Sequence, residues 1–89
     1  MLRAGAHTFR EVSYDAPSDV LYATIEDAPT ARRERTPEGH IATFDRRGRF
    51  TGLALMNARE QLEREGAVSV TLPSGEREHV QGIEAALRG

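Results

Sequence analysis

Three aspartates in predicted turns are the first candidates for chemistry in this 89-residue sequence. Asp15 and Asp19 flank one turn, and Asp45 opens another. In a meander sheet the first and third turns lie at the same end, so the three carboxylates could gather there for acid–base hydrolysis or for binding a divalent cation. Turn aspartates more often accept hydrogen bonds from local backbone amides. We therefore favour a structural role for all three.

The other residue types that carry chemistry form no recognisable pattern. His7, His40 and His79 are widely separated and include no pair at metal-ligand spacing, which favours solvated histidines. No serine lies in a Gly-x-Ser-x-Gly elbow, and the chain has no cysteine. Gly48 and Gly52 lack the strand-to-helix context of a dinucleotide-binding loop. We expect no enzyme, no metal site and no cofactor.

Two arginine clusters could contact phosphates or an acidic partner. They are Arg32, Arg33 and Arg35 in one cluster and Arg46, Arg47 and Arg49 in the other. In a meander they would lie at opposite ends of one strand, roughly 15 to 20 Å apart, so a single chain would not merge them. The net charge of −2 gives no overall attraction to nucleic acid. We favour a solvated loop face, and keep nucleic-acid binding by a dimer as the alternative.

The elements that must position these residues are short. Alternating and β-branched patterns predict strands at 8–14, 20–25, 40–44, 50–56 and 68–72. Asn57 followed by Glu60, with Gly66 at the end, predicts a helix over 58–65. After Gly75 the pattern divides: Glu78 and Val80 could form a returning hairpin strand, whereas Val80, Ile83 and Leu87 favour a second helix over 83–88. Residues 1–7 are predicted to be a loose start, and 26–39 a long exposed connection.

These elements predict an α+β fold with a four- to five-stranded antiparallel meander sheet and one or two short C-terminal helices. We expect one domain over residues 1–89, with the meander in 8–58 and a helix or strand extension in 59–89. Such a thin layer cannot cover both faces of its sheet, so we expect a homodimer. No apolar run is long enough to span a membrane, and the N-terminus lacks the apolar stretch of a signal peptide. We therefore expect a cytoplasmic protein without membrane contact.

A sequence pattern between residues 10 and 58 resembles the small bacterial domain-of-unknown-function family 2283. Its members share Tyr-Asp-x-x-x-Asp-x-Leu-Tyr-Ile, an acidic-glycine hairpin and Gly-Ile-Glu-Ile-Leu-x-Ala-Ser. The matching residues are Tyr14, Asp15, Asp19, Leu21, Tyr22, Asp45, Gly48, Gly52 and Asn57. Arg46 and Arg47 stand at turn positions that are commonly acidic in that family. The resemblance implies a small β-rich module, and an antitoxin-like partner of a small RNase-like protein.

Taken as residues, the pattern indicates structure more than chemistry. Asp15 and Asp19 suit a turn, Leu21 and Tyr22 suit a sheet, and Gly48 suits a hairpin. We therefore predict a non-enzymatic protein-interaction module, antitoxin-like in the sense that the resemblance implies. The alternative is a nucleic-acid-binding regulator that uses the arginine clusters in a dimer.

Overall fold

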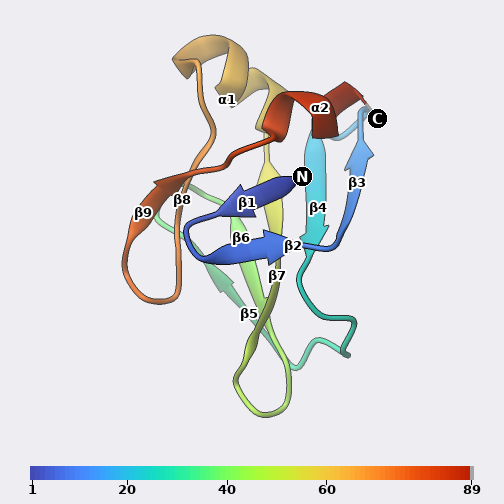
Figure 1. Ribbon diagram of the computed structural model, residues 1–89, viewed down its shortest axis with the longest axis vertical. Helices are drawn as coiled ribbons and strands as arrows, with labels where there is room; N and C mark the ends of the chain where they lie inside the picture. The colour runs from blue at the N-terminus through green and yellow to red at the C-terminus, as the bar shows by residue number, and fades with distance from the viewer. Residues whose placement is uncertain (89) are drawn as a thin grey trace.

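In the computed structural model, which describes residues 1–88, nine short strands and two short helices follow one another along the chain (Figure 1). The strands are β1 (Leu2–Ala4), β2 (His7–Phe9), β3 (Glu11–Asp15), β4 (Val20–Thr24), β5 (Arg32–Arg35), β6 (Ile41–Phe44), β7 (Phe50–Met56), β8 (Ser69–Thr71) and β9 (Arg77–His79). The helices are α1 (Ala58–Glu65) and α2 (Ile83–Arg88). Of the domain predicted over 1–89, Gly89 lies outside the described residues.

The main sheet has five antiparallel strands in the order β3-β4-β7-β6-β5. The predicted α+β class, with an antiparallel sheet and short helices, is confirmed. The meander order is wrong, because β7 lies between β4 and β6. After β4 the chain crosses the end of the sheet, where the backbone N–H groups of Ile25 and Glu26 both donate to the Thr51 carbonyl. It then enters the far edge of the sheet as β5.

Strand β5 lies within the segment 26–39 that was predicted to be an exposed connection. All four of its residues are exposed, and it pairs on one side only, with β6. It has no apolar residue, so no alternation of apolar and polar residues marked it as a strand. Charged side chains are typical of an exposed sheet edge, because they oppose pairing with a further chain.

Two small hairpins lie outside the main sheet. The predicted strand 8–14 is divided, since His7–Phe9 pairs with β1 whereas Glu11–Asp15 pairs with β4. Residues 1–7, predicted to be a loose start, include β1 with Leu2 and Ala4 buried. The predicted strand 68–72 pairs with β9 and does not join the main sheet.

The hairpins and helices cover one face of the main sheet, and the hydrophobic core lies between the two layers. Figure 1 shows the β1–β2 hairpin in front of β6 and β7, with α1 and α2 at one end. Leu21, Leu53 and Leu55 point into the core from the sheet. The side chains that meet them from the covering layer are Leu2, Phe9, Val68, Val70, Ile83 and Leu87. The layer therefore buries one side of the sheet.

Two side chains from the turn between β5 and β6 attach the β8–β9 hairpin to the sheet. The Glu38 carboxylate accepts hydrogen bonds from the Thr71 backbone N–H at 2.9 Å and from its hydroxyl at 2.6 Å. His40, expected to be solvated, is only 1% exposed. Its Nδ1 accepts a hydrogen bond from the Met56 backbone N–H, so its Nε2 carries the proton and donates to the Ser69 carbonyl, 3.0 Å in each case. Burial, opposed by this bond to Ser69, lowers the pKa of His40.

Candidate functional site

The face of the main sheet opposite the covering layer lies away from the two hairpins and both helices (Figure 1). Strand register places two rows of side chains across all five strands on this face, because directly paired residues share a face. The first row is Arg33, Thr43, Gly52, Thr24 and Glu11. The second row is Arg35, Ile41, Ala54, Tyr22 and Ser13. We call this surface the open face.

The centre of the open face is apolar and shallowly hollowed. Tyr22, in the middle of β4, is 51% exposed. Ile41, Ala54 and Met56 are half-buried beside it. These strands and the crossing loop line a hollow of about 400 Å³. An exposed tyrosine beside small and aliphatic side chains is typical of a protein-binding surface.

The two edges of the open face carry opposite charge. Arg33 and Arg35 lie on β5, and Glu11 and Asp15 lie on β3 at the other edge. All four side chains are exposed. The open face is therefore apolar in the middle, basic at one rim and acidic at the other.

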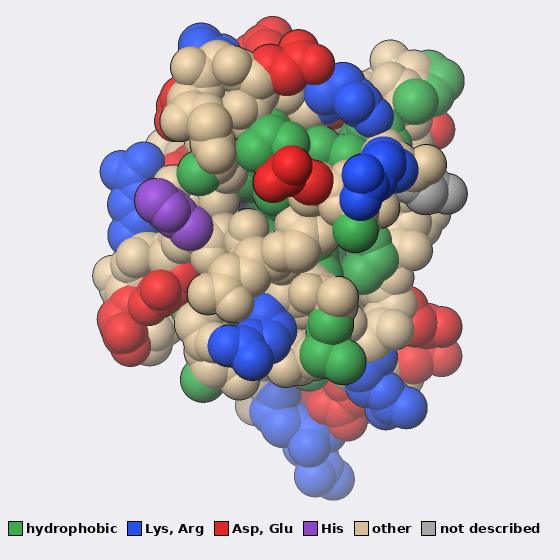
Figure 2. All heavy atoms as spheres, turned by 45° about the horizontal axis from the view of Figure 1, so that its top comes forward, with side chains coloured by type: hydrophobic (Ala, Val, Ile, Leu, Met, Phe, Trp, Pro, Cys, Tyr) green, Lys and Arg blue, Asp and Glu red, His purple; other side chains and the backbone are tan. Residues whose placement is uncertain are grey.

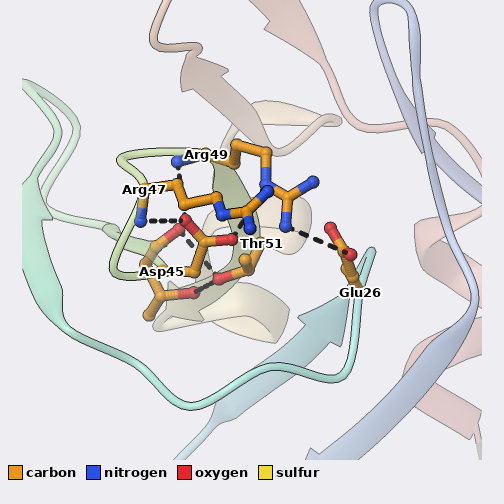
Figure 3. Close-up of polar contacts among 6 residues, drawn as sticks. Glu26, Asp45, Arg47, Arg49 and Thr51 are labelled. Carbon is orange, nitrogen blue, oxygen red and sulfur yellow. Dashed lines mark hydrogen bonds and ion pairs between the residues drawn. The ribbon is translucent and has the colours of Figure 1, made fainter.

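The turn between β6 and β7 forms a polar cluster at one end of the sheet (Figure 3). Asp45 Oδ1 accepts the backbone N–H groups of Arg49 and Arg47, each at 2.9 Å, and its Oδ2 accepts Arg49 Nε at 3.0 Å. These bonds, from Arg49 first, outweigh burial and hold the pKa of Asp45 below its ordinary value. Arg49 also lies 3.8 Å from Glu26 of the crossing loop. Asp45 therefore caps its own turn, which is the structural role expected of it.

A second polar cluster joins the β3–β4 turn to the start of α1. Asp19 Oδ1 accepts a hydrogen bond from the Tyr14 hydroxyl at 2.8 Å, and its two oxygens accept the backbone N–H groups of Arg59 and Glu60. The Arg59 guanidinium lies over the Tyr14 ring, 5.5 Å from its centroid. Burial would raise the pKa of Asp19, but these hydrogen bonds outweigh it and lower the pKa. Asn57 begins α1 with a φ of 52° and no side-chain cap.

The expected gathering of three aspartates at one end of the sheet is wrong. Because Val20 pairs with Met56 and Thr24 with Gly52, the β6–β7 turn lies at the opposite end from the β3–β4 turn. Asp15 and Asp19 are therefore a sheet length away from Asp45. Among residues 1–88, no group of three or more His, Asp or Glu side chains could hold a metal ion. The other residues of the family-like pattern are also spread over the molecule. Leu21 is in the core and Tyr22 is on the open face, whereas Gly48 and Gly52 lie toward the Asp45 end of the sheet.

The separation expected between the arginine clusters is also wrong. β5 runs antiparallel to β6 and pairs Arg32 with Phe44, which directly precedes the turn that carries Arg46, Arg47 and Arg49. The Arg32 guanidinium lies over the Phe44 ring, 4.4 Å from its centroid. Segment 32–49 holds six arginines and three acidic residues, in a chain of net charge −2. Figure 2 shows basic side chains, with acidic ones among them, at its lower end. We call the surface formed by these six arginines the arginine end: Arg32, Arg33, Arg35, Arg46, Arg47 and Arg49.

Comparisons with models of known families, with curated proteins and with solved structures each find no match to this chain. The resemblance described above therefore stays a prediction. No helix in the described part of the chain is long and apolar enough to cross a membrane. An uncovered sheet face was expected from the sequence, but the side chains that form the open face were missed, because its outline depends on the position of β5. The signal that could have found β5 is Pro37-Glu38-Gly39, a turn between two four-residue strands.

Proposed function

We propose that the protein is a non-enzymatic protein-interaction module that binds through the open face. The observation that carries this proposal is the exposed Tyr22 at the centre of a sheet face on which no described helix or strand packs. Together with the half-buried Ile41, Ala54 and Met56, Tyr22 forms a contiguous apolar patch, and such patches often mark protein-interaction sites. The charged rims give that surface a polar border, as protein interfaces have.

The antitoxin-like role is the narrower form of this proposal. It rests on the resemblance and requires a small partner protein whose surface complements this chain. Arg46 and Arg47 make one end of this molecule basic, so the complementary partner is acidic there. Co-purification with the product of an adjacent gene tests this narrower role, and its absence at micromolar concentrations would contradict it.

A photo-crosslinking amino acid at position 22 tests the main proposal in cells that make the protein. We expect a protein adduct from position 22 and none from Glu63, an exposed control position on α1. Ala54→Arg places a charged side chain beside Tyr22 and should abolish the adduct while circular dichroism shows a folded chain. Equal crosslinking from positions 22 and 63, or none from either, would contradict an interaction through the open face. The mass of the adduct identifies the partner.

Nucleic-acid binding is the second candidate function, and the arginine end favours it. The structure joins two clusters that a meander would separate, and no salt bridge is found for Arg33, Arg35, Arg46 or Arg47 among the described residues. Phosphate binding by several arginines weakens steeply with salt. Titration of a labelled duplex and a labelled single strand at two salt concentrations tests this, with Arg46→Gln/Arg47→Gln as the variant. Absent binding, or binding unaffected by salt, would exclude the candidate.

A further inference from the structure

We propose that the partner of the open face is a second copy of this chain, related by a two-fold axis that runs along the strands. This inference rests on the proposed function, since it names the partner for the same surface. It depends on the arrangement of charge across the sheet. Arg33 and Glu11 end one row, on opposite edges, with no other charged side chain between them in that row.

When two copies bring this face together symmetrically, the two-fold axis must lie in the plane between the sheets, and its two limiting directions are across the strands and along them. An axis across the strands stacks every strand on its own equivalent. Arg33 and Arg35 would then face the same arginines, and Glu11 and Asp15 would face the same acids. An axis along the strands stacks β5 of one copy on β3 of the other. Opposite charges then meet at both rims, so charge selects this arrangement.

The centre of the face is compatible with the same axis. When the axis lies above β7, Gly52 and Ala54 lie on it and face their own equivalents, where small side chains permit close approach of the sheets. Tyr22 of one copy lies over Ile41 of the other, and the reverse contact repeats it. Arg33 of one copy lies over Glu11 of the other at each rim. The axis therefore pairs opposite charges in the row of Arg33 and Glu11 and apolar side chains in the row of Tyr22 and Ile41.

The size of the face sets the expected strength of the dimer. Five strands about 4.8 Å apart and five residues with a rise of about 3.3 Å give a patch of roughly 19 by 17 Å. Two such patches with their rims bury on the order of 1,000 Å² in total, at the lower limit for a specific interface. We expect a dimer of about 19.6 kDa, twice the 9.8 kDa of one chain, that dissociates at micromolar concentrations.

Reversal of the rim charges gives a sharp test by sedimentation equilibrium across a micromolar to millimolar concentration series. Arg33→Glu and Glu11→Arg should each raise the dissociation constant of the homodimer at least about tenfold, because each puts like charges together at both rims. A mixture of the two variants should form a heterodimer, since both rims are then attractive. The double variant in one chain should recover a homodimer. Both positions are exposed edge residues, so these variants should fold.

The control is Arg88→Glu, which makes the same change of charge at an exposed position on α2 and should leave the dissociation constant unchanged. A chain that stays monomeric throughout the series would overturn the inference. A dimer whose strength ignores both charge reversals, or a mixture without heterodimer, would overturn it too. In each of those cases crosslinking from position 22 still decides the proposed function, because an adduct with a different protein would support the open face as an interaction site.

Discussion

The carboxylate of Asp19 accepts a hydrogen bond from the backbone N–H of Arg59, 2.8 Å from Oδ1, although the two residues are 40 positions apart. Its Oδ2 accepts the backbone N–H of Glu60 at 3.1 Å. These N–H groups lie in the first turn of α1. Like the first N–H groups of any α-helix, they have no acceptor within the helix. Asp19 therefore caps a helix from a distant turn and holds α1 against the β3–β4 end of the sheet.

Replacement of Asp19 by Ala should lower the free energy of unfolding by about 2 kcal/mol. The change removes the cap and leaves Ala at a φ of 55°, which Asp and Asn tolerate better. Asp19→Asn keeps one oxygen acceptor and the backbone conformation, so it should cost less than half as much. Urea denaturation followed by circular dichroism measures both. Equal losses would show that the side-chain oxygens do not stabilise α1.

Local sequence signals located several elements correctly. The predicted helices at 58–65 and 83–88 are confirmed, as is the antiparallel α+β class. Gly66, with a φ of 79°, ends α1 as its position predicted. The β-branched run from Val20 and the run from Phe50 both form central strands. These features depend on side chains within a few residues of one another, so a single sequence records them.

Long-range pairing could not be predicted in the same way. The position of β7 between β4 and β6 depends on contacts among segments about 30 residues apart, such as Tyr22 with Ala54. A meander has the shorter connections, so local reasoning favours it. Two further predictions were wrong because they depended on the meander order. Asp45 was expected at the same end of the sheet as Asp15 and Asp19, and the two arginine clusters were expected at opposite ends of one strand. The Asp19–Arg59 cap was missed for the same reason, because Asn57 was the nearest capping residue in sequence.

Substitution of Gly52 by Ala should disturb the contact between β4 and β7. A Cβ at Gly52 would lie 2.6 Å from the Ala23 carbonyl oxygen and 3.2 Å from the Thr43 hydroxyl. The obstacle is backbone of a central strand, so we expect a loss of about 2 kcal/mol in the free energy of unfolding. Gly48→Ala is the comparison, since Gly48 has open space around it and only its φ of 81° opposes a side chain. Thermal denaturation should rank Gly52→Ala as the more damaging change, and the reverse order would contradict the close contact.

Removal of the Glu38 carboxylate should release the β8–β9 hairpin from the sheet. Glu38 accepts two hydrogen bonds from Thr71 and lies 3.6 Å from Arg77. Glu38→Ala leaves the partly buried Thr71 N–H without its acceptor, which should lower protection of that amide by about 2 kcal/mol. Hydrogen exchange followed by NMR measures this directly, with the exposed Glu76→Ala as control. Unchanged exchange at Thr71 would show that the hairpin is held by its apolar contacts alone.

The hydrogen-bonded carboxylates predict a loss of stability in acid. The pKa values of Asp19 and Glu38 are lowered in the folded chain, where burial opposes the shift and hydrogen bonds outweigh it. The unfolded chain therefore takes up protons first, at a pH of about 4. Their contribution is present above that pH and is lost as the pH falls toward the folded-state values. Melting temperatures measured between neutral and strongly acidic pH should show this fall, and Asp19→Asn should reduce its slope.

His40 predicts a separate pH dependence at higher pH. Because burial lowers its pKa in the folded chain, the unfolded chain binds the proton first, near pH 6.5. Its contribution is therefore complete above about pH 6.5 and is lost as the pH falls below that value. His40→Gln should remove this slope, whereas His79→Gln at an exposed position should keep it. Long-range ¹H–¹⁵N spectra should show the Nε2–H tautomer persisting below pH 6.5, because protonation of Nδ1 would break its bond from the Met56 N–H. An ordinary titration of His40 in the folded protein would contradict this arrangement.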